Sequence, residues 1–201
     1  MHYIGHLSKD PKLKTLIEKY GPFELKKHKN VCLRLCASIM SQQLSTKVAD
    51  VFYSRFLNLF NGKDPTPQQI LQVPPQTLRS IGLSNAKVSY VHNVARFAVE
   101  QGMDHRKLTR MSDEEVITLL TSIKGVGRWT AEMLLMFTLG REDICPLDDL
   151  GAANALISLY KLKIRDKKKL REKMRKIASV WSPYRTYAYL YLWRWKDDVS
   201  K

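Results

Sequence analysis

One segment, residues 121–149, constrains the chain more than any other. It begins Thr-Ser-Ile-Lys-Gly-Val-Gly-Arg-Trp-Thr-Ala at Thr121 and ends Pro-Leu-Asp-Asp at Asp149. An apolar helix end runs directly into two glycines, and a second helix follows them at once. Gly125 can adopt a positive φ angle without strain at Cβ, so the chain can reverse direction sharply there. The segment therefore predicts two helices joined by a very short turn.

The chemistry of this turn favours an anionic ligand. Gly127 has no side chain to block an approaching group. The N–H groups of the following helical turn, together with the positive end of the helix dipole, suit an oxyanion such as phosphate. Lys124 and Arg128 add positive charge beside the glycines. A Gly-x-Gly pair alone would be weak evidence, because most such pairs are ordinary turns between helices.

Net charge points in the same direction. The chain has 34 Lys and Arg against 19 Asp and Glu, a formal charge of +15, which favours a polyanionic partner. Nucleic acid is favoured over a membrane surface, because the sequence has neither an apolar run of about 18 residues nor an opening signal peptide. We therefore expect a protein of the cytoplasm, associated with the nucleoid, or of the nucleus in a eukaryote. Three cysteines indicate a reducing compartment, and Cys32 and Cys36, one helical turn apart, are expected to be buried thiols.

Apolar residues recur at helical spacing along the whole chain, and no strand-like alternation is found. The fold class expected is all-α. We expect residues before 8 to be frayed, and helices over 8–20, 29–43, 46–60, 75–81, 85–101, 116–123, 128–139, 149–162, 166–179 and 182–197, with a short one after Thr66. Several N-caps are predicted by hydroxyl side chains, namely Ser45, Thr66, Ser84, Ser112 and Ser182.

Three segments carry a resemblance to a known family. They are Ile-Lys-Gly-Val-Gly-Arg-Trp-Thr-Ala with the later Pro-Leu-Asp-Asp, Ser-Ile-Met-Ser-Gln-Gln-Leu-Ser at residues 38–45, and Trp-Ser-Pro-Tyr-Arg-Thr-Tyr-Ala at residues 181–188. Together they resemble the helix-hairpin-helix DNA glycosylase superfamily, and most of all its 3-methyladenine DNA glycosylase II branch, which removes alkylated purines. The resemblance spans roughly residues 23–196. It implies one glycosylase domain over residues 1–201, with two helical lobes (32–140, and 1–31 plus 141–201) around a DNA-binding cleft.

The resemblance places the catalytic aspartate at Asp149, the second acid of the pair that starts with Asp148. A carboxylate beside the sugar would stabilise the oxocarbenium-like transition state and activate the attacking water. The alternative is that Asp149 only caps a helix. Asp148 is expected to be a cap or a structural partner.

Trp129 stands where strand-cutting members of the family have a lysine that attacks the sugar. An indole is not a nucleophile, so the resemblance implies a monofunctional enzyme that uses water. An electron-rich ring can stack on a cationic alkylated purine. Trp193 is expected as a second wall of the base pocket, whereas Met133 and Leu150 replace tyrosines found in the related branch. These two departures leave open the preference among 3-methyladenine, 7-methylguanine and 1-methyladenine.

DNA contacts are implied at two places. Gln42, Gln43 and Leu44 lie where relatives carry the side chain that fills the gap left by a flipped base. By register Gln43 fits this role best and Leu44 next, although Leu44 could instead be a core residue. The hairpin, through residues 124–128 including Val126, is expected to hold a backbone phosphate.

No cofactor is expected to be required. Some relatives hold an iron-sulfur cluster with closely spaced cysteines near the C-terminus, and this chain has no cysteine after Cys145. In relatives a monovalent cation bridges hairpin carbonyls to the phosphate, which here would be a Na⁺ or K⁺ ion on the carbonyls of Thr121, Ile123 and Val126.

The partner implied is double-stranded DNA that contains alkylated bases, bound by a monomer. Two alternatives stay open. One is a non-catalytic module that uses the hairpin only to bind duplex DNA, and the other is a glycosylase for mismatched or oxidised bases. Asp149 together with Trp129 favours the alkylpurine enzyme, because a binding module would need neither.

Overall fold

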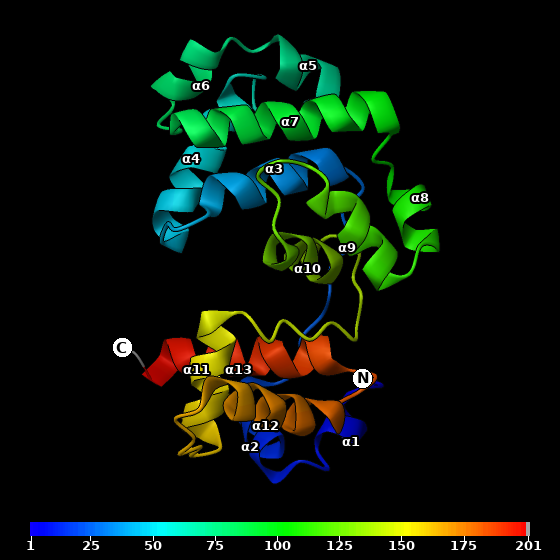
Figure 1. Cartoon of the computed structure of the whole chain (residues 1–201), viewed down its shortest axis with the longest axis vertical. Helices are drawn as coiled ribbons and strands as arrows, with labels where there is room; N and C mark the ends of the chain where they lie inside the picture. Colours follow the sequence, from blue (N-terminus) through cyan, green and yellow to red (C-terminus); the bar gives the residue numbers. More distant parts are fainter. Residues whose placement is uncertain (200–201) are drawn as a thin grey trace. The chain divides into compact units, whose positions relative to one another are not determined.

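The computed structural model describes residues 1–199, and within that range thirteen helices and no strands form (Figure 1). The all-α fold predicted from the sequence is therefore confirmed. The chain divides into two compact units. Unit 2 is Lys26–Leu139, and unit 1 combines Met1–Leu25 with the chain from Gly140 onward. The sequence predicted lobe boundaries after residues 31 and 140, whereas the observed units divide after Leu25 and Leu139.

Unit 2 is built around one long central helix. Its helices are α3 (Val31–Ser41), α4 (Thr46–Asn58), α5 (Pro67–Gln72), α6 (Pro75–Ser80), α7 (Asn85–Gln101), α8 (His105–Arg110), α9 (Asp113–Thr121) and α10 (Arg128–Phe137). Helix α7 packs against α3, α5 and α6, and α10 packs against α3 and α9 (Figure 1). Helix α3 buries seven apolar residues over more than half of its circumference, and the remaining face, at Arg34, Ala37, Ser38 and Ser41, is half-buried. Cys32 and Cys36 on it are buried thiols, as predicted.

Most helix starts in unit 2 follow the predicted caps. Thr66 and Ser112 form capping boxes with Gln69 and Glu115, and the Ser84 hydroxyl accepts a hydrogen bond from the Lys87 amide. Ser45 precedes α4 but makes no side-chain cap to the described residues. Helix α8 was not predicted, although the Asp104 side chain caps it in the ordinary way.

Unit 1 contains α1 (Ile4–Leu7), α2 (Pro11–Tyr20), α11 (Leu150–Leu159), α12 (Lys167–Ser179) and α13 (Arg185–Val199). Helix α13 packs against α11 and α2. Asp10 joins several of these elements, because it caps α2 and its Oδ2 accepts hydrogen bonds from Tyr160 Oη (2.5 Å) and Trp181 Nε1 (3.0 Å). Burial and the Asp10 carboxylate raise the pKa of Tyr160, which keeps this phenol a donor.

The N-terminus is ordered, so the expectation of frayed residues before Ser8 is wrong. Tyr3 is 1% exposed and stacks on Tyr187 with ring centroids 3.8 Å apart. His2 Nε2 lies 3.0 Å from Glu142 Oε1, and His6 Nε2 donates to the Val180 carbonyl. Burial of an aromatic side chain by distant residues fixes this segment, and local sequence does not reveal it.

The last helix also begins later than predicted. Ser182 does not cap it, and its hydroxyl donates to Asp143 Oδ2 (2.8 Å) in the loop between α10 and α11. Helix α13 starts at Arg185, whose Nε and Nη2 donate to the same Asp143 carboxylate at 2.7 and 2.8 Å. Burial would raise the pKa of Asp143, but the bonds from Arg185 and Ser182 outweigh it and lower that pKa below its ordinary value. Within residues 1–199 no helix is both long and apolar enough to cross a membrane.

Candidate active site and DNA-contacting elements

The hairpin between α9 and α10 has the two-glycine geometry predicted. Gly125 has a φ angle of +106°, and a Cβ placed there would lie 2.2 Å from Tyr90 Cγ. The turn is also held from α7 by Asn93, whose Nδ2 donates to the Lys124 carbonyl (3.1 Å). Only glycine satisfies both the backbone angle and the close approach of the Tyr90 side chain.

Gly127 has a different role in the same turn. Its φ angle is −91° and it is the N-cap of α10. A Cβ added at Gly127 would meet no described atom within 4 Å beyond its two chain neighbours. Among residues 1–199, no side chain caps α10. An uncapped helix start with no described atom in front of Gly127 is the arrangement expected for binding an oxyanion.

Arg128 contributes less free charge to the turn than its sequence position suggests. Its guanidinium pairs with Glu114, and its Nε donates to Glu132 Oε1 (3.1 Å). The Glu114 carboxylate raises the pKa of Arg128. Both residues are exposed, but within residues 1–199 only Arg128 of the two is in an ion pair, so Lys124 supplies the unpaired charge beside the hairpin glycines and Arg128 mainly fixes the start of α10.

The loop after α3 places Gln43 at an exposed tip. Gln43 has a φ angle of +60°, unusual for a residue with a side chain, whereas Leu44 is half-buried. Gln42 points in another direction, because its Nε2 donates to Thr130 Oγ1 (3.3 Å) in the first turn of α10. Of the three residues predicted to probe DNA, Gln43 is the most exposed and Gln42 joins the loop to α10.

Lys87 holds this loop, and sequence analysis did not assign it that role. Its Nζ donates to the carbonyls of Met40 (2.9 Å) and Gln42 (2.8 Å). An ammonium group at the C-terminal end of α3 also complements the helix dipole. Burial lowers the pKa of Lys87. The sequence signal that could have indicated this role is the position of Lys87 in the motif Gly-Leu-Ser-x-x-Lys, three residues after the Ser84 cap.

The two predicted pocket residues on α10 are one helical turn apart. Trp129 is 37% exposed, a large value for tryptophan, and Met133 is 8% exposed. Both belong to unit 2.

In unit 1, Asp149 is the N-cap of α11. Its Oδ1 accepts hydrogen bonds from the Ala152 amide (2.6 Å) and from Trp193 Nε1 (2.8 Å). The side chain is half-buried, and the next residue, Leu150, is 75% exposed. An oxygen that accepts two N–H donors is fixed in orientation. Sequence reasoning did not foresee that Trp193 contacts Asp149.

A glycine leaves room beside this carboxylate. A Cβ at Gly151 would lie 3.2 Å from Asp149 Oδ1 and 3.4 Å from Lys196 Nζ. The ammonium of Lys196 is therefore a close neighbour of the Asp149 carboxylate. Asp148 faces elsewhere and forms a two-point ion pair with Arg171 (2.5 and 3.0 Å), as a structural partner would.

The sequence matches the HhH-GPD superfamily of base excision DNA repair proteins over residues 36–180. This chain belongs to that superfamily. The matched span contains the hairpin, the loop at residues 42–44 and Asp149.

Two similar curated proteins are named as DNA-3-methyladenine glycosylases, one of them putative. This chain is 35% identical over 198 residues to DNA-3-methyladenine glycosylase 1 of Schizosaccharomyces pombe, and the aligned region covers 96% of this chain and 85% of that protein. It is 33% identical over 201 residues to the putative DNA-3-methyladenine glycosylase YfjP of Bacillus subtilis, covering 96% and 68%. The solved structure of Schizosaccharomyces pombe Mag1 in complex with abasic DNA matches with a TM-score of 0.86 and 32% identity over 96% of each chain.

Proposed function

We propose that this protein is a monofunctional DNA glycosylase of base excision repair. It would flip alkylated purines, such as 3-methyladenine and 7-methylpurines, out of duplex DNA and hydrolyse the N-glycosidic bond. The observation that carries the proposal is the Asp149 carboxylate, held at the start of α11 by two N–H donors in a chain of this superfamily.

The chemistry assigns Asp149 two tasks. As the bond between C1′ and the base nitrogen breaks, its electron pair leaves with the base and the sugar becomes oxocarbenium-like. The carboxylate stabilises that positive charge, and it then takes a proton from the water that adds to C1′. Trp193 is a positioning residue, because its indole N–H holds Asp149 Oδ1. The products are the free base and an abasic site.

Trp129 supports both the water mechanism and the substrate class. It occupies the position of the strand-cutting lysine, so no amine is available there to form a covalent intermediate with the sugar. Alkylation at N3 or N7 makes a purine cationic, and an exposed indole gains about 0.5–2 kcal/mol by stacking on a cation. Met133, one turn along α10, would add an apolar side chain beside Trp129. The pocket roles of Leu150 and Trp193, which belong to unit 1, stay predictions from the resemblance.

DNA would be held through the hairpin and probed through the loop after α3. The uncapped start of α10 after Gly127 suits a backbone phosphate, and Lys124 adds charge beside it. The exposed Gln43 is the residue proposed to fill the gap left by the flipped base. This protein would act as a monomer on DNA, in the nucleoid or the nucleus.

A monovalent cation is proposed at the hairpin carbonyls of Thr121, Ile123 and Val126. Within residues 1–199, no loop or turn hydrogen bond uses the Thr121 or Val126 carbonyl, and Ile123 accepts one bond from the Val126 amide, which leaves its second lone pair. These oxygens therefore fit a Na⁺ or K⁺ ion. When bound, the ion would supply positive charge to the phosphate.

The adjacent aspartates provide a matched test of the catalytic assignment. Asn caps helices as well as Asp does, so Asp149→Asn should keep α11 folded and lose the negative charge. We expect Asp149→Asn to slow the release of free base from methylated duplex DNA at least 100-fold, and Asp148→Asn to retain nearly all activity. Base release by Asp149→Asn at the wild-type rate would overturn the assignment.

The alternative functions, a non-catalytic binding module or a glycosylase for mismatched or oxidised bases, are distinguished by which base, if any, is released. A panel of duplexes with alkylated, oxidised or mismatched bases should give release of alkylpurines first. Trp129→Ala should keep its affinity for undamaged DNA and reduce excision. Incubation of the wild-type protein with borohydride and substrate should trap no covalent adduct; a trapped adduct would instead indicate an amine nucleophile. Duplex binding without release of any base would favour the non-catalytic module.

A further inference from the structure

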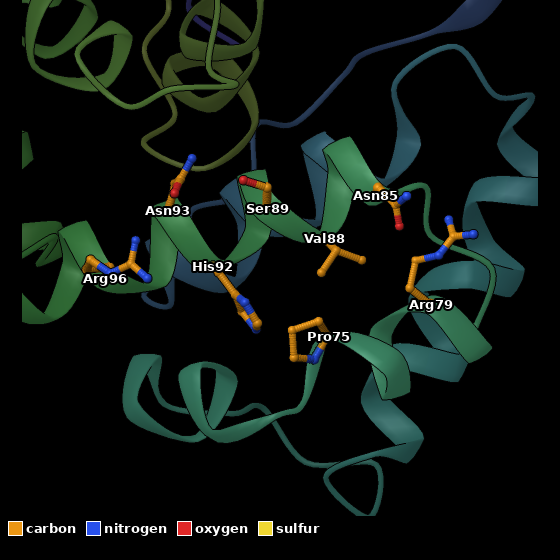
Figure 2. A pocket seen from close by; sticks show the side chains of 8 residues that line it. All are labelled: Pro75, Arg79, Asn85, Val88, Ser89, His92, Asn93 and Arg96. Carbon is orange, nitrogen blue, oxygen red and sulfur yellow. The ribbon is translucent and has the colours of Figure 1, made fainter.

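A groove in unit 2 lies along α7 and is lined by polar and basic side chains. It has a volume of about 350 Å³, and Figure 2 shows its lining on α7 and α6. Two arginines, Arg79 and Arg96, line it, together with the neutral polar side chains of Asn85, Ser89 and Asn93. Among the described residues that line it, none is Asp or Glu. A groove with this composition attracts an anion.

Part of this lining is already fixed in place by main-chain carbonyls. Arg79 Nη1 donates to the Leu83 carbonyl (2.7 Å), and His92 Nε2 donates to the Val73 carbonyl (3.1 Å). The first bond joins α6 to the turn before α7, and the second joins the end of α5 to α7. The guanidinium of Arg79 is thereby oriented, with further N–H groups available.

The remaining polar groups have no protein partner. Within residues 1–199, the side chains of Asn85, Ser89 and Arg96 make no hydrogen bond or ion pair, and all three residues are exposed. They recur on α7 at a spacing close to whole helical turns, so they present one stripe of donors along the helix. Their hydrogen-bonding groups are therefore available to a ligand from solution.

The groove continues toward the hairpin. Asn93 belongs to its lining and also donates to the Lys124 carbonyl of the hairpin, and it points toward the hairpin loop in Figure 2. Asn93 therefore joins the lining of the groove to the hairpin. A polyanion bound at the start of α10 would extend along α7 from this residue.

We propose that this groove binds a second phosphodiester of the same DNA duplex, so that unit 2 holds the backbone at two positions. The inference rests on the DNA binding proposed above. Arg96 supplies the charge, and Ser89 and Asn85 supply neutral hydrogen-bond donors. Each phosphate neutralised by a protein cation releases counterions from DNA, so the contact contributes a defined amount to the salt dependence of binding.

The test is the salt dependence of binding to undamaged duplex DNA, measured by fluorescence anisotropy. Arg96→Ala should lower the slope of log K against log salt by about 0.9 and weaken binding about fivefold to tenfold near 0.1 M salt. Arg110→Ala is the matched control, because it removes the same charge from an exposed position on α8 outside the groove. It should leave the slope unchanged, and Arg96→Lys should restore most of it.

A second pair of variants adds charge in place of removing it. Ser89→Asp puts a carboxylate into the groove and should weaken duplex binding more than Ser54→Asp, an equivalent change on the exposed face of α4. Equal effects of Arg96→Ala and Arg110→Ala, or of the two Ser→Asp changes, would overturn the proposal. The proposal would also be overturned if Arg96→Ala bound DNA with wild-type affinity and lost affinity only for an acidic peptide.

Base release separates this inference from the proposed function. At limiting enzyme, Arg96→Ala should release methylated base more slowly than wild type, in proportion to its weaker DNA binding, whereas the control Arg110→Ala should release it at the wild-type rate. If the wild-type protein released no base, the glycosylase assignment would fail, while the difference in salt slope would still decide whether the groove binds DNA.

Discussion

Replacement by alanine should affect different properties at the two hairpin glycines, namely the stability of the fold at Gly125 and the binding of DNA at Gly127. Gly125→Ala forces a side chain into a conformation at φ +106°, which costs about 1–2 kcal/mol. The new Cβ would also lie 2.2 Å from Tyr90 Cγ, so the ring or the turn must move, at about 1–3 kcal/mol for an overpacked site. Together these effects should lower the free energy of unfolding by about 2–5 kcal/mol, a fall in Tm on the order of 10 °C.

Gly127→Ala meets no such obstacle. At φ −91° and with open space around it, alanine fits, and loss of a favourable N-cap residue costs only about 0.5 kcal/mol. The added methyl group stands in front of the amides proposed to bind phosphate. We therefore expect nearly wild-type stability with about tenfold weaker binding to duplex DNA.

Thermal unfolding and anisotropy titrations of both variants give a direct check. The expected pattern is a destabilised Gly125→Ala protein and a stable Gly127→Ala protein that binds DNA poorly. A stable Gly125→Ala protein would refute the role given to the Tyr90 contact. Unimpaired DNA binding by Gly127→Ala would refute the phosphate site.

Two further changes test side chains that act from a distance. Lys87→Met keeps the aliphatic stem and removes both bonds to the carbonyls at the end of α3. Denaturant unfolding should show a free energy of unfolding lower by about 1–2 kcal/mol, and the rate of base excision should fall more than the affinity for duplex DNA. The control Lys63→Met, at an exposed site, should change neither the stability nor the rate of excision. Asp143 has a pKa below its ordinary 3.8, so its ion pair with Arg185 stabilises the fold above that pH and stops doing so as pH falls through the lowered pKa. Unfolding curves from pH 2 to 7 should therefore show Asp143→Asn less stable than wild type near neutral pH and equal to it at the acid end; a constant difference across this range would argue against the ion pair.

Features that depend on neighbours in the chain could be predicted from the sequence. The caps at Thr66, Ser84 and Ser112 each involve a residue only three positions away, and each helix starts directly after its cap. After Ser112 this start is Asp113, three residues before the expected start of that helix. The same holds for the hairpin, where a short string of residues specifies both the reversal and the open helix start. The superfamily was recognisable because these local segments carry its motifs.

Side-chain pairings between distant segments were decided by the tertiary structure. The sequence predicts a positive φ angle at Gly125 and an open approach at Gly127, but only the fold shows that Tyr90 from α7 packs closely against Gly125. It presents Arg128 as hairpin charge, and the fold pairs it with Glu114.

Asp149 shows both contributions. The sequence by itself determined that a carboxylate starts the helix after the hairpin, because a cap is formed with the next few residues. The fold alone brought Trp193 and Lys196 from α13 to that carboxylate. Local hydrogen bonds follow from spacing along the chain, but contacts across dozens of residues depend on how the helices pack, which residue spacing does not specify.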